Sequence, residues 1–187
     1  MNKSVLVVHG SPRKNGNSSY LAQTAVDELK KNNVAVEELF LRNLTIAPCM
    51  ACDGCRNKKA KYCVINDDMA ACYEKILNAS AILLASPIYW FTYTAQLKLF
   101  IDRCYGVWNW HNDVFKDKKI GIILVYGDSD PYSGGAVNAI HTFEHMFKFT
   151  QAEIVDIVYG TAWDEGDAAK DKDLIKKAQA LGKKLSS

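Results

Sequence analysis

The sequence predicts an α/β protein built on one doubly wound, five-stranded parallel sheet with helices on both faces. Short runs of strand-forming apolar residues alternate along the chain with segments whose apolar residues recur at helical spacing. The first, third and fourth of these runs are apolar throughout, as expected of parallel strands that helices cover on both sides. The 187 residues fit one domain of ordinary size, and 49% hydrophobic residues are enough for a buried core.

The expected elements follow one another in a regular order. We place strands at residues 5–8, 34–40, 81–85, 120–126 and 154–159. We expect helices to begin at Ser18 or Ser19, at Asp67 and Asp68, and near Thr94, Ala136 and Asp171. Periodicity alone does not determine the strand order, for which we take 2-1-3-4-5. No repeat or linker divides the chain, so we predict one domain over residues 1–187 with an irregular cysteine-rich excursion at about 42–66.

Composition and charge narrow the functional classes. A net charge of +2 gives no reason to expect nucleic acid or a membrane as the main partner. The apolar run near the start is too short for a signal peptide, and no stretch reaches the length of a membrane span. We therefore expect a cytoplasmic protein, in which six cysteines more often serve metal binding, redox chemistry or core packing than disulfides.

The polar loop after the first predicted strand, residues 9–19, has the features of a phosphate-binding loop. The helix that follows it offers free N–H groups and the positive end of its dipole. Arg13 supplies a charged fork that suits a phosphate, and Gly10 and Gly16 let the backbone turn tightly around an anion. Further hydrogen-bond donors are Ser11, Asn17 and Ser18. The loop lacks the ending of a P-loop, and an ordinary polar turn with a solvated arginine is the alternative.

The loop after the third predicted strand, residues 86–94, is unusually aromatic. Pro87 stiffens it, and four side chains can present flat faces to a ring system: Tyr89, Trp90, Phe91 and Tyr93. In the order 2-1-3-4-5 the first and third strands flank the point where the strand order reverses, which is where open α/β sheets bind ligands. The two loops would then meet, with residues 127–135 as a third wall. Core packing or a dimer contact is the alternative for the aromatic residues.

Three segments together resemble the NAD(P)H-dependent FMN reductase family. They are Gly-Ser-Pro-Arg-Lys-Asn-Gly-Asn-Ser at 10–18, Ser-Pro-Ile-Tyr at 86–89 and Ala-Gln-Leu-Lys-Leu-Phe-Ile-Asp-Arg at 95–103. The cysteine segment that ends in Asn-Asp-Asp-Met at 66–69 is more similar to the iron–sulfur flavoproteins within that family. The resemblance covers essentially the whole chain. It implies a flavodoxin-like fold, bound FMN, NAD(P)H as a transient co-substrate and a homodimer or homotetramer.

This resemblance assigns flavin-binding residues to three loops. The FMN phosphate would be bound by Ser11, Arg13, Asn17 and Ser18. The isoalloxazine would lie along Pro87, Ile88, Tyr89 and Trp90. The third loop would contribute Gly127 and Asp128, although it holds fewer glycines than is usual in the family. No catalytic acid or base is required, because the flavin carries the chemistry.

Four cysteines follow the spacing C-x2-C-x2-C-x7-C, at Cys49, Cys52, Cys55 and Cys63. Three thiolates this close can surround one part of a [4Fe–4S] cluster, with a fourth arriving from the next turn. In iron–sulfur flavoproteins the last gap is often shorter, so free or disulfide-prone thiols and a zinc site stay as alternatives. Cys72 and Cys104 lie on apolar helix faces and are expected in the core.

Two functions of different kinds follow from this reasoning. In the first, the protein is an oxidoreductase in which NAD(P)H reduces bound FMN, and the flavin reduces a quinone, free flavin or another acceptor. In the second, an iron–sulfur flavoprotein carries electrons between a ferredoxin-like donor and FMN without direct use of NAD(P)H. A redox sensor that acts through the cysteine loop is a third interpretation.

Aromatic side chains also predict self-association. The side chains of Phe91, Tyr93, Trp108 and Trp110 add up to more apolar surface than a small monomer leaves to water. We therefore expect at least a dimer, with these residues at or near the interface.

Overall fold

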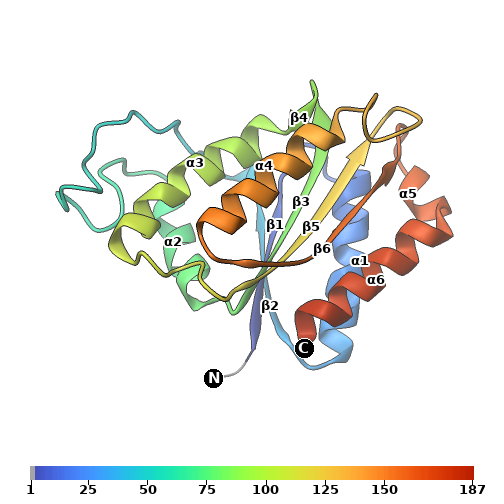
Figure 1. Ribbon diagram of the computed structural model, residues 1–187, viewed down its shortest axis with the longest axis horizontal. Coiled ribbons are helices and arrows are strands. Elements are labelled where there is room, and N and C mark those ends of the chain that lie inside the picture. Colours follow the sequence, from blue (N-terminus) through green and yellow to red (C-terminus); the bar gives the residue numbers. More distant parts are fainter. Residues whose placement is uncertain (1–2) are drawn as a thin grey trace.

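The computed structural model describes residues 3–187 and has a twisted central sheet between two layers of helices (Figure 1). Five parallel strands form the sheet in the order β2 (Ala35–Phe40), β1 (Ser4–His9), β3 (Ala81–Tyr89), β5 (Lys119–Tyr126) and β6 (Glu153–Thr161). A short sixth strand, β4 (Thr92–Tyr93), pairs antiparallel with β3. The predicted fold class is confirmed, because the five long strands have the expected order 2-1-3-4-5 when β4 is left aside.

The helices divide between the two faces of the sheet. One face is covered by α1 (Asn17–Lys31) and α6 (Lys172–Ser186), with the short α5 (Asp167–Lys170) beside them (Figure 1). The other is covered by α2 (Met69–Asn78), α3 (Ala95–Trp110) and α4 (Ala136–Phe149). A 3-10 turn, η1 (Leu41–Asn43), follows β2. None of the helices in the described part of the chain is long and apolar enough to span a membrane.

The apolar strands fill both cores at once. Along β1, Val5 and Val7 pack beneath α1 and α6, whereas Leu6 and Val8 pack beneath α2, α3 and α4. Successive side chains of a strand point to opposite faces, so a strand covered on both sides needs an unbroken apolar run. This is why the sequence of β1 carries no polar alternation.

Several features differ from the sequence prediction. Helix α1 begins at Asn17 with Gly16 at the N-cap position, so neither Ser18 nor Ser19 caps it. The third strand continues to Tyr89 instead of ending at 85, because Ile88 and Tyr89 pair with β4 in a hairpin. The α5 turn was not predicted. The prediction that Tyr93 forms part of an exposed aromatic surface is wrong: it is 4% exposed, and its ring lies 5.0 Å from that of Phe143 in the core. Cys72 is buried as predicted, and Cys104 packs against the same core.

Close contact between α1 and α6 depends on Gly182. A Cβ atom at this position would lie 2.5 Å from the carbonyl oxygen of Ala25 and 2.9 Å from Cβ of Glu28. We expect Gly182→Ala to force the helices apart and to lower the free energy of unfolding by about 1–3 kcal/mol. Urea denaturation measures this change.

The matched control is Lys177→Ala, a change at an exposed position of α6 that we expect to alter stability by less than about 0.5 kcal/mol. Equal stability of Gly182→Ala and the control would show that the two helices are not in close contact in solution.

Candidate flavin site

A network of hydrogen bonds joins the carboxyl ends of β1 and β3. The Gly10 amide donates to the carbonyl of Ala85 (2.7 Å), and the Thr94 hydroxyl donates to the carbonyl of Gly10 (2.7 Å). The same hydroxyl accepts from the Leu97 amide (3.3 Å) and so caps α3, as the sequence predicted. The loops that leave β1 and β3 therefore begin from one rigid point.

A hollow of about 760 Å³ opens at this edge of the sheet. All ten residues that the sequence assigned to FMN line it, although they come from three separate loops. Its volume is within the ordinary range for sites that take a small molecule or cofactor. The structure thus brings together the residues that the sequence singled out, and the chemistry of each end shows what the hollow can hold.

The end formed by residues 11–18 is suited to an anion. Helix α1 begins here without a side-chain cap, so the N–H groups of its first turn face the hollow without a side-chain acceptor. The hydroxyl of Ser18 is buried and has no hydrogen-bond partner within residues 3–187. Arg13 lies exposed at the rim, and its backbone amide donates to Ser11 Oγ (3.2 Å). A phosphate would supply the acceptor oxygens that these donors lack.

Gly16 is required by the tightness of this turn. A Cβ atom at this position would lie 2.5 Å from Ser11 Oγ, so a larger residue would displace the serine from the hollow. The sequence reasoning identified both glycines of the loop, and the structure supplies this physical reason for the second.

Asn17 lines the hollow, but its amide is already occupied. Its Nδ2 donates to the carbonyl of Asp164 (2.8 Å), and its Oδ1 accepts from the amides of Gly166 (3.1 Å) and Ala168 (3.2 Å). These bonds hold the segment that follows β6 against the start of α1. The side chain therefore builds a wall of the hollow, and what faces a ligand here is the first turn of α1.

The opposite end is formed by the β3–β4 hairpin. Pro87, Ile88 and Tyr89 line the hollow from β3, and the turn consists of Trp90 and Phe91, whose φ angles are +50° and +67°. Positive φ at both positions is typical of a two-residue hairpin turn and is strained for bulky side chains. Two contacts hold it: Nδ2 of Asn138 donates to the Phe91 carbonyl (3.1 Å), and the backbone of Gly135, with φ +74°, packs against Phe91.

The third wall is the loop after β5, with Gly127 and Asp128. The Thr161 hydroxyl donates to the carbonyl of Asp128 (2.6 Å). Further along, Ser133 donates hydrogen bonds to the carboxylate of Asp130 and holds the pKa of this group below its usual value. Asp130 therefore stays ionised and fixes the turn that leads to α4.

Sequence reasoning missed a fourth wall, formed by Trp163, Asp164 and Glu165 after β6. The Trp163 ring lies on Gly127, where a Cβ atom would be 1.9 Å from a ring carbon. Parallel strands end at the same edge of a sheet, so the position of this segment after the fifth long strand was the available signal. The contacts of this segment with Asn17 and Gly127 join residues far apart in the chain, so no local sequence pattern indicates them.

Comparisons with known proteins identify the family of the chain. The profile of a family described as NADPH-dependent FMN reductase matches residues 4–162. An iron–sulfur flavoprotein of Methanosarcina thermophila is 34% identical over 142 residues, 74% of this chain and 71% of the relative. One of Archaeoglobus fulgidus is 33% identical over 181 residues, 95% of this chain and 76% of the relative.

This chain belongs to the NADPH-dependent FMN reductase family. It is a flavoprotein oxidoreductase with FMN as its cofactor. Among solved structures, the Trp repressor binding protein from Bacillus subtilis has a TM-score of 0.71 at 28% identity, over 96% of this chain and 98% of that one.

The hollow fits the cofactor of the family. A flavin needs an anion site at one end and a flat, largely apolar wall at the other, and the hollow provides both within one cavity. The buried Ser18 hydroxyl without a partner is the clearest sign, since such groups are rare unless a ligand completes them.

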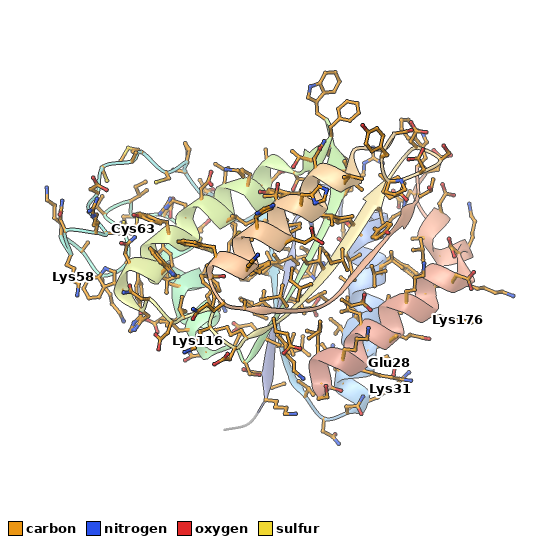
Figure 2. All side chains as sticks on the ribbon, in the orientation of Figure 1. Glu28, Lys31, Lys58, Cys63, Lys116 and Lys176 are labelled. Carbon is orange, nitrogen blue, oxygen red and sulfur yellow. The ribbon has the colours of Figure 1, made fainter. Side chains whose placement is uncertain are left out.

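The four cysteines lie outside this hollow. They are free thiols on the segment between η1 and α2, which contains no helix or strand. Cys49 and Cys52 are exposed, whereas Cys55 and Cys63 are half-buried. Figure 2 shows Cys63 and Lys58 at the end of the molecule opposite Lys176. Within residues 3–187, no three His, Cys, Asp or Glu side chains are gathered as a metal site would require.

The phosphate end can be tested with two single changes. Arg13→Ala removes a charge-assisted contact, and we expect it to weaken FMN binding by about 1.5–3 kcal/mol. Ser18→Ala should weaken FMN binding while leaving the stability of the FMN-free protein unchanged or raised, because the hydroxyl has no partner to lose. Titration calorimetry and thermal unfolding give the two quantities.

Lys14→Ala is the control, because Lys14 is an exposed neighbour that does not line the hollow. If all three variants bind FMN as tightly as the wild type does, the phosphate lies elsewhere.

Proposed function

We propose that the chain is a single flavodoxin-like domain that binds FMN in the hollow and uses it to pass electrons from NAD(P)H to a small acceptor. The observation that carries the proposal is that an uncapped helix start and an aromatic hairpin face one cavity. In this arrangement the first turn of α1, with Ser11, Arg13 and Ser18, binds the phosphate. Asn17 supports it by holding the fourth wall.

The isoalloxazine would lie along Pro87, Ile88, Tyr89 and Trp90, with Gly127 and Asp128 as the third wall. When bound, FMN supplies the redox chemistry: it takes a hydride from a reduced nucleotide and gives electrons to an acceptor. The residues of the chain orient the flavin and leave one side of the cavity open for a second molecule. Trp90 is 93% exposed at that opening, where its ring could stack on a nicotinamide or a quinone.

Anaerobic titration with reduced nucleotides tests the oxidoreductase function. We expect NADPH or NADH to remove the visible absorption of oxidised FMN in the holoprotein, one flavin per nucleotide, because in this proposal a nicotinamide enters the cavity beside the flavin. Dithionite serves as the control reductant.

Added menadione should then restore the absorption without oxygen. Reduction by dithionite but by neither nucleotide would contradict this proposal and leave the electron-carrier function.

The second candidate function is favoured by the cysteine loop. We propose that Cys49, Cys52, Cys55 and Cys63 bind one [4Fe–4S] cluster, which would exchange single electrons between a ferredoxin-like donor and FMN. The four thiols suit iron and sulfide in kind, and Arg56, Lys58 and Lys59 on the same loop would offset the negative charge of a cluster. Because no three of these thiols are gathered as a metal site requires in residues 3–187, cluster binding would bring them together.

Iron and acid-labile sulfide in anaerobically reconstituted protein test this candidate. We expect about four of each per chain, as a [4Fe–4S] cluster requires, and much less in Cys52→Ala. Cys104→Ala, which changes a thiol outside the loop, should keep the wild-type content. No difference between wild type and Cys52→Ala would exclude the cluster.

We also propose that the chain forms homodimers or homotetramers. An apolar hollow of about 560 Å³ between α3 and α4 is lined by Tyr105, Trp108 and Phe149, and Phe149 is 73% exposed. Apolar surface of this kind is typical of interfaces. We further propose a cytoplasmic location, a reducing compartment in which cysteines serve metal binding, redox chemistry or core packing more often than disulfides.

Light scattering at micromolar concentration should therefore give at least twice the mass of one chain. Phe149→Lys should reduce the mass to that of a monomer, because it places a charge in the apolar contact. Glu144→Lys, at an exposed position of the same helix, should leave the mass unchanged. A monomeric wild type would contradict the proposal.

A further inference from the structure

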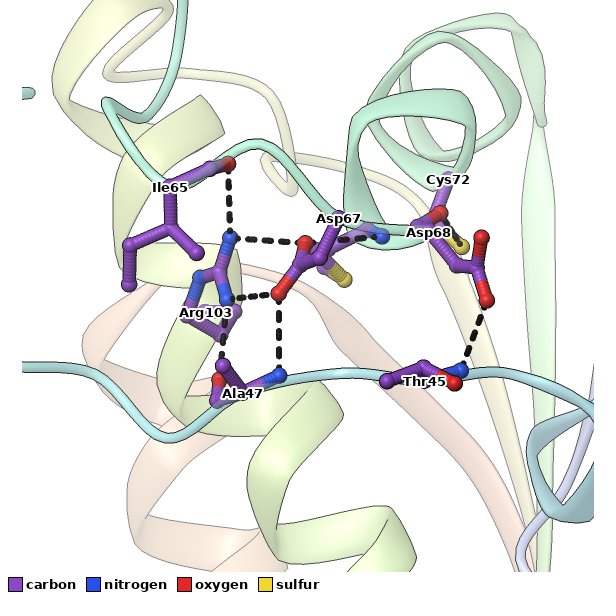
Figure 3. Close-up of polar contacts among 8 residues, drawn as sticks. Thr45, Ala47, Ile65, Asp67, Asp68, Cys72 and Arg103 are labelled. Atoms are coloured by element: carbon purple, nitrogen blue, oxygen red, sulfur yellow. Dashed lines mark hydrogen bonds and ion pairs between the residues drawn. The ribbon is translucent and has the colours of Figure 1, made fainter.

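The two ends of the cysteine loop are held together by a buried ion pair that belongs to neither site. Arg103 on α3 is 2% exposed. Its Nη1 donates to Oδ2 of Asp67 (2.7 Å), and its Nη2 donates to Oδ1 (3.1 Å) (Figure 3). This bidentate contact fixes the guanidinium plane relative to the carboxylate plane. Asp67 lies four residues after the last cysteine of the loop. The pair therefore anchors the point at which the loop rejoins the fold.

The same pair reaches the other end of the loop. Nη1 of Arg103 also donates to the carbonyl of Ala47 (2.8 Å), and Asp67 Oδ2 accepts from the Ala47 amide (2.9 Å). Ala47 lies two residues before Cys49. Beside it, the Thr45 amide donates to Oδ2 of Asp68 (2.7 Å) (Figure 3). Residues 45–47 and 65–68 are thereby closed into a neck from which the loop projects.

The charge of Asp67 is stable in this setting. Burial opposes its ionisation, but the Arg103 guanidinium and the amides of Ala47 and Met69 outweigh that effect and hold its pKa below the usual value. An ionised Asp67 keeps the neck closed at neutral pH. Breaking a buried pair by removing one partner is costly, so the closure is not easily lost.

Tyr62, next to Cys63, is packed against α3 in the same region. Its carbonyl would be 2.9 Å from a Cβ atom at Gly106, so the glycine allows the loop to lie directly on the helix. Its ring lies 5.0 Å from that of Tyr73 and 6.1 Å from that of Trp110. The position of Cys63 is thus fixed by the backbone on its N-terminal side.

Three buried donors around this point have no partner within residues 3–187. They are Nε of Arg103, the hydroxyl of Tyr73 and Nε1 of Trp110. The Tyr73 hydroxyl lies at the same place as the chain before Cys63: a Cβ atom at Gly106 would be 3.2 Å from this hydroxyl and 2.9 Å from the carbonyl of Tyr62. Buried donors without acceptors are unusual, and negatively charged sulfur is an acceptor that would complete them.

We propose that Arg103 and Asp67 are positioning residues for the cluster loop: they close its neck and, with Tyr73, surround Cys63 with donors that favour a negatively charged sulfur centre. This inference rests on the proposed cluster. It assigns a role to residues that carry no metal ligand and lie outside the flavin hollow.

The test compares anaerobically reconstituted holoproteins. Arg103→Lys keeps the charge but loses the planar fork that contacts Asp67 and Ala47 together, and Arg103→Met loses both. We expect both variants to bind iron about 10- to 100-fold more weakly in competition with a chelator, as changes next to metal ligands do. FMN should still bind one per chain. Lys98→Ala is the control, because it removes the exposed pair with Asp102 on the same helix.

Tyr73→Phe adds a readout that a purely structural role would not change. It removes one hydroxyl, and loss of a donor to a sulfur centre should shift the midpoint potential of the cluster to a more negative value. If the Arg103 variants fail to bind FMN and are therefore misfolded, Tyr73→Phe still tests whether donors near Cys63 favour the cluster. Wild-type iron affinity in Arg103→Lys, or a wild-type potential in Tyr73→Phe, would overturn the proposal.

Hydrogen exchange tests closure of the neck independently of cluster binding. In iron-free protein the Ala47 amide should exchange faster in Arg103→Met than in the wild type or in Lys98→Ala, because Asp67 is no longer held against it. If wild-type protein takes up no iron, the cluster proposal fails and this measurement still tests the neck. Unchanged exchange would show that the ion pair does not hold the loop.

Discussion

The hydroxyl of Thr94 makes the contact on which the candidate flavin site depends. By donating to the Gly10 carbonyl and accepting from the Leu97 amide, it joins the end of β1, the hairpin after β3 and the start of α3. Thr94 is fully buried, so neither bond competes with water. The FMN proposed for this hollow would need its phosphate site and its ring site at a fixed separation, and this junction sets the separation of the two loops. The fourth wall, held by Asn17, adds a further side to the cavity next to this junction.

Much of this arrangement could be predicted from the sequence because it depends on local patterns. Unbroken apolar runs indicated parallel strands, and a loop with two glycines, three serines and one arginine before a helix indicated an anion site. The hairpin at Trp90 and Phe91 could not be predicted, since its turn lacks the Asn-Gly signal and is held by Asn138 and Gly135 from another part of the chain. The position of Asn17 in the loop predicted a ligand contact, yet its side-chain amide is hydrogen-bonded to backbone groups from a distant part of the chain.

Buried polar groups without a partner occur both in the candidate flavin hollow and near the cysteine loop. Five such side-chain atoms occur in residues 3–187; one is the hydroxyl of Ser18 in the candidate flavin hollow, and three belong to Tyr73, Arg103 and Trp110, near the end of the cysteine loop. The sequence identified the four cysteines from their spacing, but Arg103 and Asp67 are 36 residues apart and carry no motif. An arginine on an otherwise apolar helix face was the only signal of a buried ion pair, and its partner could be found only in three dimensions.

Because the neck is closed, the length and the composition of the cysteine loop can change without a change in the sheet. Because residues 45–47 and 65–68 are tied to each other and to α3, the chain leaves and re-enters the fold at points that do not depend on what lies between them. An insertion or deletion during evolution would then change only the projecting part, at a small cost in loop entropy. A lineage could shorten the gap before the last cysteine, or discard the cysteines altogether, while the loops that line the candidate flavin hollow stayed as they are.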